Sequence, residues 1–208
     1  MFQSQLIFEI NLISLFDYLG TFAFAISGIK MAYNKQIDWF GAYVIGLVTA
    51  IGGGTIRDLF LGTTPFWMIE PKYLITTGFA LVTLILFKSK LSKWGGLLFI
   101  FDTIGLGFFT IVGINKSIEA GFPTWVCILM GTITASTGGV IRDILLNQIP
   151  LLFQREIYAI ACLLGGIMYF TLKFFVFNIE FIEISSVLTV VLIRFLSVKY
   201  RIHLPQLK

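Results

Sequence analysis

One segment of twenty residues occurs twice in this chain, and this repeat constrains the fold more than any other feature. Residues 46–65 read GLVTAIGGGTIRDLFLGTTP and residues 131–150 read GTITASTGGVIRDILLNQIP, with ten identical positions and no gap. The shift that carries residue 46 onto residue 131, which we call the repeat offset, also aligns Asp17 with Asp102. Each copy places glycines, an arginine and an aspartate inside an apolar run. An internal repeat of this kind is typical of membrane transport proteins whose pathway lies at the repeat interface.

Composition places the repeat in a membrane. The chain of 208 residues is 57% hydrophobic and 12% charged, whereas a soluble domain carries about 25% charged residues. Because a helix of about 20 apolar residues spans a bilayer, the pattern predicts an all-α integral membrane protein with seven spanning helices. Their predicted ranges are 11–32, 40–62, 71–88, 95–115, 124–147, 156–175 and 182–198. Residues 1–208 are expected to form a single multi-pass domain in the inner or plasma membrane.

An odd number of helices in each repeat gives the two copies opposite orientations. The first repeat is predicted over residues 11–88, the second over 95–175, and a seventh helix over 182–198 lies outside both. Because the second copy enters the membrane from the opposite side, the halves are inverted and related by a pseudo-two-fold axis in the membrane plane. The seventh helix is expected to serve packing or oligomerisation.

Basic residues orient the chain. With Arg57 and Arg142 set aside as intramembrane, ten basic residues fall on the side of the C-terminus and three on the other side. The positive-inside rule then predicts a cytoplasmic C-terminus and an N-terminus outside. The ten are Lys30, Lys35, Lys88, Lys90, Lys93, Arg155, Arg194, Lys199, Arg201 and Lys208, and the three are Lys72, Lys116 and Lys173. The basic side is expected to contact anionic lipids; nucleic acid is not an expected partner, because no folded basic domain presents these charges.

Six charged residues are predicted inside the membrane, three towards each face. They are Asp17, Arg57 and Asp58 in the first repeat and Asp102, Arg142 and Asp143 in the second. An unpaired charge in hydrocarbon is costly, so Asp17 with Arg57, and Asp102 with Arg142, are the expected partners. The remaining aspartates complete each cluster or cap nearby backbone. Two interpretations stay open: these groups hold helices together as buried ion pairs, or they line a pore.

Glycine clusters stand in the middle of the second and fifth predicted helices. They are Gly52, Gly53 and Gly54 in the first copy and Gly138 and Gly139 in the second. A helical glycine costs about 1 kcal/mol relative to alanine, so the clusters need a compensating use. A kink or local unwinding that frees carbonyls for a wet cavity is favoured over close helix packing, because adjacent glycines do not follow the GxxxG spacing.

Hydroxyl side chains flank the glycines. The candidates are Thr49, Thr134 and Thr137. Their hydroxyls can bond freed carbonyls or a passing ion, or can bond the preceding turn of their own helix. The sequence has no GxxxxGK[ST], HExxH, CxxC or GxSxG motif, so no enzyme activity, catalytic residue, cofactor or metal site is expected beyond transient potassium. It also lacks a TVGYG-type filter.

With the motif GGGTIRD followed by FW, and its second copy TGGVIRD, the chain resembles the TRIC family of trimeric intracellular cation channels, in particular the short bacterial and archaeal homologues. The resemblance covers residues 12–200. It implies a homotrimer with one pore inside each protomer, bordered by the second and fifth helices, which the glycine motifs kink. Thr137 stands where a third glycine would fall, which implies a milder second kink. The tail is short, so regulation by calcium, voltage or phosphoinositide is not implied.

The resemblance implies conduction of monovalent cations, chiefly potassium. Bacterial relatives are also described as glycine transporters, so a secondary transporter for a small amino acid such as glycine is the alternative, and inverted repeats suit alternating access. A third hypothesis is a membrane scaffold without transport. The charged residues in both copies argue against the scaffold, and the channel is the preferred interpretation.

Overall fold

The computed structural model is all-helical, and it describes residues 12–87, 96–154, 157–176 and 178–202. Those residues contain eight α-helices and one short 3-10 helix. In chain order they are α1 (Leu12–Asn34), α2 (Trp39–Phe60), α3 (Phe66–Ile69), α4 (Lys72–Leu86), α6 (Leu97–Glu119), α7 (Thr124–Leu145), η1 (Leu151–Phe153), α8 (Ala159–Phe175) and α9 (Ile179–Lys199).

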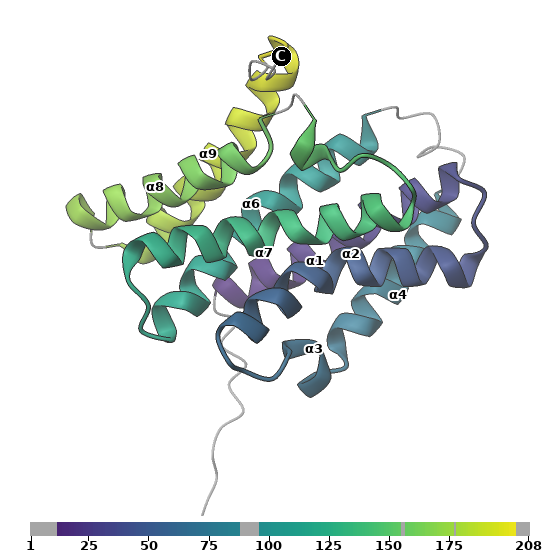
Figure 1. Cartoon of the computed structure of the whole chain (residues 1–208), viewed down its shortest axis with the longest axis horizontal. Helices are drawn as coiled ribbons and strands as arrows, with labels where there is room; N and C mark the ends of the chain where they lie inside the picture. Colours follow the sequence, from purple (N-terminus) through teal and green to yellow (C-terminus); the bar gives the residue numbers. More distant parts are fainter. Residues whose placement is uncertain (1–11, 88–95, 155–156, 177, 203–208) are drawn as a thin grey trace, which may run out of the picture.

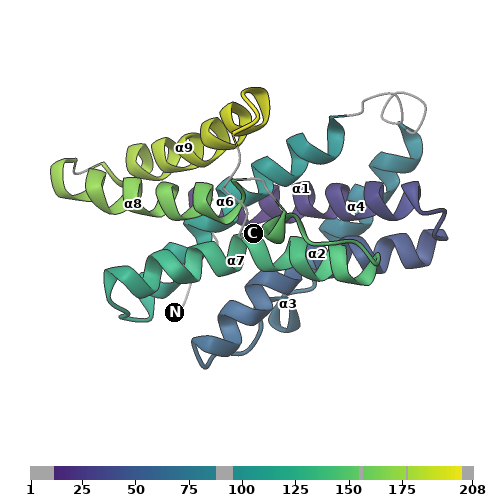
Figure 2. The ribbon, with the colours of Figure 1, turned by 45° about the horizontal axis from the view of Figure 1, so that its top comes forward.

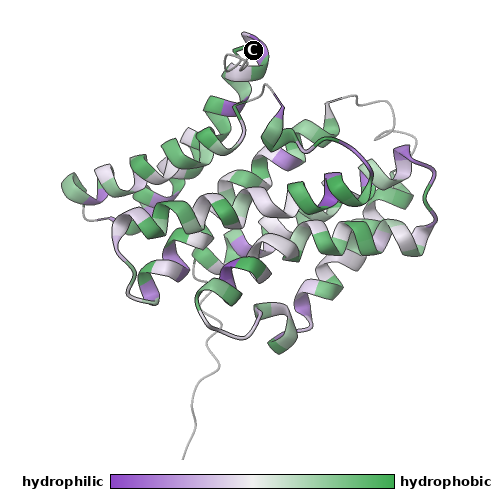
Figure 3. Cartoon of the chain, viewed as in Figure 1, coloured by the Kyte–Doolittle hydropathy of each residue, from purple (hydrophilic) through white to green (hydrophobic). Residues whose placement is uncertain are grey.

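Seven of these helices match the seven predicted ranges, with ends that differ by up to four residues. Among the described residues, α1, α2, α6, α7 and α9 are long and apolar enough to cross a membrane, and α4 and α8 are shorter apolar helices. Large apolar side chains point outward, as in Phe40 and Phe174, which are 77% and 88% exposed. Hydrophilic residues gather in the connections and at a few positions inside the bundle (Figure 3). Such an outward apolar surface is suited to lipid.

The short helices α3 and η1 were not among the predicted elements. Each follows a proline, Pro65 or Pro150, at the end of the repeated motif. The turns before them need a left-handed residue, which Gly62 supplies with φ of 70° and Asn147 with φ of 52°. The repeat offset aligns these two positions as well, so both copies leave the membrane helix through the same turn.

Four helices, α1, α2, α6 and α7, form the centre of the molecule. α4 packs on α1 and α2, α8 packs on α7, and α9 packs on α6 and α8. The α1–α2 connection lies at one end of the molecule and the α6–α7 connection at the opposite end (Figure 1). Figure 2 shows α8 and α9 side by side along one edge of the central helices. The repeated motifs of α2 and α7 therefore meet in the interior.

Glycine allows α2 and α7 to touch backbone to backbone. A Cβ added at Gly53 would collide with the carbonyl oxygen of Thr134, and a Cβ added at Gly138 would collide with that of Thr49. The two contacts exchange under the repeat offset, as a two-fold relation between the halves requires. Both helices continue through their glycines without interruption. The prediction of local unwinding is therefore wrong here, because close packing of the two helices gives the glycines their use.

Candidate functional site

Each motif arginine binds the aspartate that follows it, with the same geometry in both copies. Arg57 Nε donates to Asp58 Oδ1 at 2.8 Å, and Arg142 Nε donates to Asp143 Oδ1 at 2.8 Å. The second carboxylate oxygen accepts a backbone N–H eight residues later, from Phe66 at 2.9 Å or Leu151 at 3.0 Å. Each aspartate thus does both things expected of it, completing an ion pair and capping the next segment. We name Asp17, Arg57 and Asp58 the first cluster, and Asp102, Arg142 and Asp143 the second cluster.

The second cluster is closed to solvent. Arg142 Nη1 lies 2.5 Å from Asp102 Oδ1 and donates to Ser27 Oγ at 2.6 Å. Ser27 in turn donates to Asp102 Oδ1 at 3.3 Å, which joins α1 to α6 and α7. Arg142 is 0% exposed and both aspartates are 1% exposed. The predicted pair of Asp102 with Arg142 is confirmed, as burial requires for opposite charges away from water.

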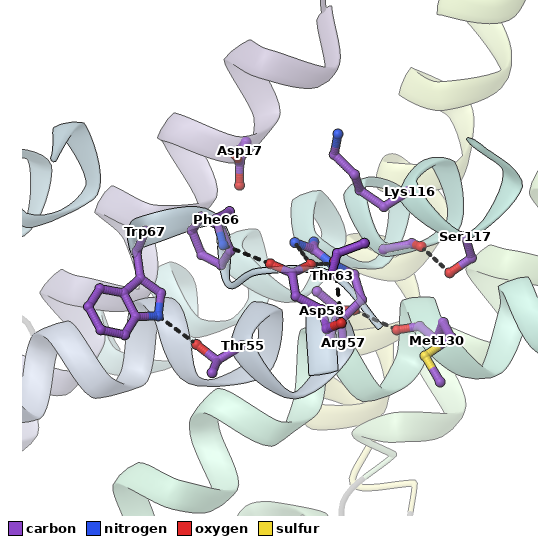
Figure 4. Close-up of polar contacts among 12 residues, drawn as sticks. Asp17, Thr55, Arg57, Asp58, Thr63, Phe66, Trp67, Lys116, Ser117 and Met130 are labelled. Atoms are coloured by element: carbon purple, nitrogen blue, oxygen red, sulfur yellow. Dashed lines mark hydrogen bonds and ion pairs between the residues drawn. The ribbon is translucent and has the colours of Figure 1, made fainter. Parts of the chain in front are cut away.

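The first cluster is open, and its predicted pair is wrong. Asp17 makes no ion pair with Arg57 among the described residues; its Oδ2 instead accepts a hydrogen bond of 2.5 Å from the Tyr73 hydroxyl. Asp17 lies on the wall of a cavity of about 600 Å³. Figure 4 shows its carboxylate directed towards the Arg57–Asp58 pair without touching it. Because water in the cavity can solvate Asp17, burial does not force it onto the arginine.

Charged side chains of both signs line this cavity. Four carboxylates and three cationic groups surround it: Asp17, Asp58, Glu70 and Glu119, with Arg57, Lys72 and Lys116. Three ion pairs use all three cations, namely Arg57 with Asp58 at 2.7 Å, Lys72 with Glu70, and Lys116 with Glu119 at 3.1 Å. Among the lining residues, Asp17 is the carboxylate left without a cationic partner. The cavity therefore carries one formal negative charge in excess.

The flanking hydroxyls bond their own helices. Thr49 donates to the carbonyl of Ile45 and Thr134 to that of Met130, each at 2.6 Å. Of the alternatives left open, the preceding-turn bond is therefore observed for both. Thr137 is partly exposed on α7.

The remaining motif glycines accommodate side chains rather than backbone. Gly54 lies under the ring of Phe66, and Gly52 faces Ile141, whose Cδ1 would lie 3.0 Å from an added Cβ. Gly139 lies under the hydroxyl of Tyr158, which would be 2.6 Å from an added Cβ. Gly54 and Gly139 thus make room beside each cluster for an aromatic residue from the following segment.

Sequence reasoning missed three residues of these clusters. Tyr73 and Tyr158 align under the repeat offset, so the comparison that revealed the motifs also contained this pair. Ser27 aligns with Val112, so the repeat gave no signal for it. The described residues contain no group of three or more histidine, cysteine, aspartate or glutamate side chains arranged to hold a metal ion.

Comparison with known proteins gives one consistent group. The family model described as Glycine transporter matches residues 14–89 and again 99–173. The UPF0126 inner membrane protein YadS of Escherichia coli is 37% identical over 195 residues, which cover 91% of this chain and 93% of YadS. A UPF0126 membrane protein of Vibrio cholerae is 38% identical over 205 residues, 97% of this chain and 85% of that protein.

Solved structures show the same fold. The TRIC trimeric intracellular cation channel orthologue from Rhodobacter sphaeroides superimposes with a TM-score of 0.86 at 32% identity, over 91% of this chain and 98% of that chain. A structure that describes conductance through TRIC cation channels gives a TM-score of 0.83 at 36% identity, over 94% of this chain and 97% of that one. These neighbours are ion channels and not enzymes. The chain therefore belongs to the family of the Glycine transporter model and the UPF0126 membrane proteins, and it is a short, prokaryotic-type member of the TRIC family.

Proposed function

We propose that this protein is a passive channel for monovalent cations, chiefly potassium, with one pathway inside each protomer. The solved relatives are described as cation channels and as trimeric, which supports a cation channel that assembles as a homotrimer. The E. coli relative is described as an inner membrane protein, which supports a multi-pass position in the inner membrane. The pathway is proposed to pass the two clusters and to be bordered by α2 and α7.

The unpaired carboxylate of Asp17 carries this proposal. It faces the cavity of about 600 Å³ while the three cationic residues of the lining are engaged with other carboxylates. A cavity with excess negative charge and low-dielectric walls concentrates cations and repels anions. Rings or clusters of carboxylates are a common entrance to cation pathways. Asp17 is therefore proposed as the first carboxylate without a cationic partner that an entering cation meets.

The second cluster is proposed as the closed point of the pathway. Its buried Arg142 holds Asp102 and Ser27 together, and an arginine repels cations unless its partners neutralise it. Opening then requires movement of α7 against α1 and α6. The close contact of α2 with α7 at Gly53 and Gly138 allows the helices to slide or bend past each other, which is the role proposed for the glycine motifs in place of a permanent break.

The membrane topology remains a proposal. Seven crossings, an N-terminus outside and a C-terminus in the cytoplasm follow from the sequence, and the exchange of glycine contacts under the repeat offset supports inverted repeats at 11–88 and 95–175. Anionic lipids are proposed to contact the exposed residues of the basic side, which among the described residues are Lys35, Lys199 and Arg201, whereas Lys30 and Arg194 are buried. Five more residues of that side, Lys88, Lys90, Lys93, Arg155 and Lys208, lie outside the described residues.

A secondary transporter for a small amino acid such as glycine is the second candidate. One observation favours it: the cavity opens at the first cluster while the second cluster is closed. That is the arrangement of an alternating-access carrier in one of its two states. The mixed charges of the cavity would also suit an ammonium and a carboxylate on one solute.

Ion flux from liposomes separates the two candidates. We expect purified protein in vesicles loaded with potassium chloride to release potassium at a rate indifferent to external glycine. Asp17→Asn should slow that release several-fold, whereas the control Glu180→Gln, which alters an exposed carboxylate outside the lining of this cavity, should change it little. Saturable uptake of labelled glycine with negligible potassium release would overturn the channel. Equal flux in both variants would refute the role of Asp17.

A further inference from the structure

Two tyrosines at corresponding positions of the repeats differ in the hydrogen bonding of their hydroxyls. Tyr73, at the start of α4, donates to Asp17 of the first cluster at 2.5 Å. Tyr158, its counterpart in the second repeat, occupies the N-cap position of α8 without a side-chain capping bond. Its hydroxyl does not bond Asp102, the counterpart of Asp17. It lies over Gly139 on α7. A Cβ added at Gly139 would be 2.6 Å from the Tyr158 hydroxyl and 3.6 Å from Arg142 Nη2.

The closed second cluster leaves polar atoms unsatisfied. Asp102 Oδ2, Arg142 Nη2 and the Tyr158 hydroxyl are buried and have no hydrogen-bond partner among the described residues. Buried polar atoms without partners destabilise the arrangement that contains them. A hydrogen bond from Tyr158 to Asp102, like that from Tyr73 to Asp17, would remove two of these three defects. Instead, a contact from α9 holds Tyr158 over Gly139.

Arg194 on α9 supplies that interaction. Its guanidinium carbon lies 5.0 Å from the centre of the Tyr158 ring and 5.3 Å from that of Phe99. Its Nη1 donates to the carbonyl of Ile157, the residue before Tyr158, at 3.2 Å. Arg194 is 1% exposed, and cation–π attraction is strongest when the cation is removed from water. One side chain thus holds both the ring of Tyr158 and the backbone that leads into it.

The first repeat has a different arrangement around its tyrosine. The Tyr73 ring packs edge-on against Phe66 at 4.3 Å. Its cation is Lys72, the adjacent residue, whose Nζ lies 5.4 Å from the ring centre; Lys72 is partly exposed and paired with Glu70 at the cavity, whereas Arg194 is buried and comes from another helix. α9 lies outside the repeat and packs on α6 and α8, so it acts on the second repeat. The position of Arg194 therefore coincides with the difference between the two clusters.

We propose that Arg194 is a positioning residue that holds Tyr158 over Gly139 and so keeps the second cluster closed. When Arg194 releases the ring, Tyr158 leaves Gly139 and no longer covers Arg142, and this end of the pathway opens. The inference rests on the proposed function for its meaning as a gate, while the structural link from Arg194 to the second cluster is testable without any flux measurement. α9 then determines which end of the protein is shut.

Cysteine accessibility in the full-length protein in liposomes tests this link. Cys127→Ala and Cys162→Ala remove the two native thiols, and Ser27→Cys places a reporter inside the second cluster. Ile26→Cys is the matched control, because Ile26 is also 1% exposed but packs in the apolar core. A water-soluble cationic methanethiosulfonate labels either thiol at a rate that reports opening to water. Arg194→Met removes the charge and keeps the length of the side chain.

We expect Arg194→Met to speed labelling at position 27 about tenfold or more, from the loss of a buried cation–π contact and a charged hydrogen bond, and to leave labelling at position 26 unchanged. Arg194→Lys, which keeps the charge without the planar group, should lie between Met and the parent. Unchanged labelling at position 27, or a parallel rise at position 26 that signals general loosening, would overturn the proposal.

Tyr158 variants keep the test decisive if Arg194→Met does not fold. Tyr158→Leu should open position 27 as Arg194→Met does, whereas Tyr158→Phe, which keeps the ring on Arg194, should stay as slow as the parent. The double variant Arg194→Met/Tyr158→Leu should label position 27 no faster than either single variant, because both substitutions remove the same contact between Arg194 and the Tyr158 ring. If the two increases in labelling rate multiplied in the double variant, the proposed role of Arg194 would be contradicted. Failure of potassium flux alongside the expected labelling would reject the channel and leave the positioning role intact.

Discussion

The contact between α2 and α7 gives a sharp prediction for Gly53→Ala. The new Cβ would collide with the main-chain carbonyl of Thr134, while the nitrogen of Gly138 would lie 3.4 Å away. A backbone carbonyl cannot rotate aside as a side chain does, so the two helices must separate. Overpacking of this kind costs about 1–3 kcal/mol, sometimes more.

The alanine also brings a benefit that must be subtracted. Replacing glycine by alanine inside a helix gains about 1 kcal/mol of intrinsic preference. Gly78→Ala on α4 is the matched control, because nothing lies within 4 Å of its Cβ position, so it keeps the gain without the collision. We therefore expect Gly53→Ala to be about 1–3 kcal/mol less stable than Gly78→Ala, which is the overpacking cost alone.

Thermal unfolding in detergent, followed by circular dichroism and by the elution of the folded protein, measures this difference. Gly78→Ala should melt at or above the temperature of the parent, and Gly53→Ala should melt below it and lose potassium flux. Adding Gly138→Ala should cost less than a second full increment, since both alanines force apart one contact. If Gly53→Ala proved as stable as Gly78→Ala, close packing could not be the reason for the glycine.

Three further outcomes follow from the clusters and their turns. Asp102→Asn leaves Arg142 paired with Asp143 but weakens a buried charged hydrogen bond, and should lower stability by about 1.5–3 kcal/mol, measured by the same melts, with the surface-paired Glu119→Gln as the control near zero. Tyr73→Phe should free Asp17 from its hydrogen bond and alter the concentration of potassium that half-saturates flux while leaving stability within about 1.5 kcal/mol of the parent. Asn147→Ala should destabilise by about 1 kcal/mol because its φ of 52° is left-handed, whereas glycine there should be tolerated; equal melts for the two would refute the argument.

The sequence predicts the helices and one of the two expected ion pairs. Long apolar runs give seven helices to within a few residues, because membrane insertion depends on length and hydropathy. The pair of Asp102 with Arg142 was also predictable, since both are buried and opposite in charge. The corresponding pair of Asp17 with Arg57 does not form, because Asp17 lies beside a cavity. That cavity depends on how α3 and α4 pack, which the repeat does not reveal.

The glycine motifs illustrate a second limit. Adjacent glycines are compatible with a kink and with close helix contact, and the sequence of one helix does not show which other helix packs against it. The contact between Gly53 and Thr134 joins two different helices from opposite halves of the chain, so it becomes visible when α2 and α7 are placed together. Ser27 was out of reach for a similar reason, because its partner Arg142 lies in the other half of the sequence.

The reciprocal glycine contacts also bear on the history of the chain. Each half supplies the glycine that receives the other half's carbonyl, so two identical halves could have satisfied each other as an inverted dimer before they were joined. In such a dimer every substitution would appear at both ends. Fusion into one polypeptide lifts that constraint, and a single helix added after the second copy can act on one end alone. An inverted dimer of identical halves would need this symmetry to assemble, whereas a single chain that contains both halves does not.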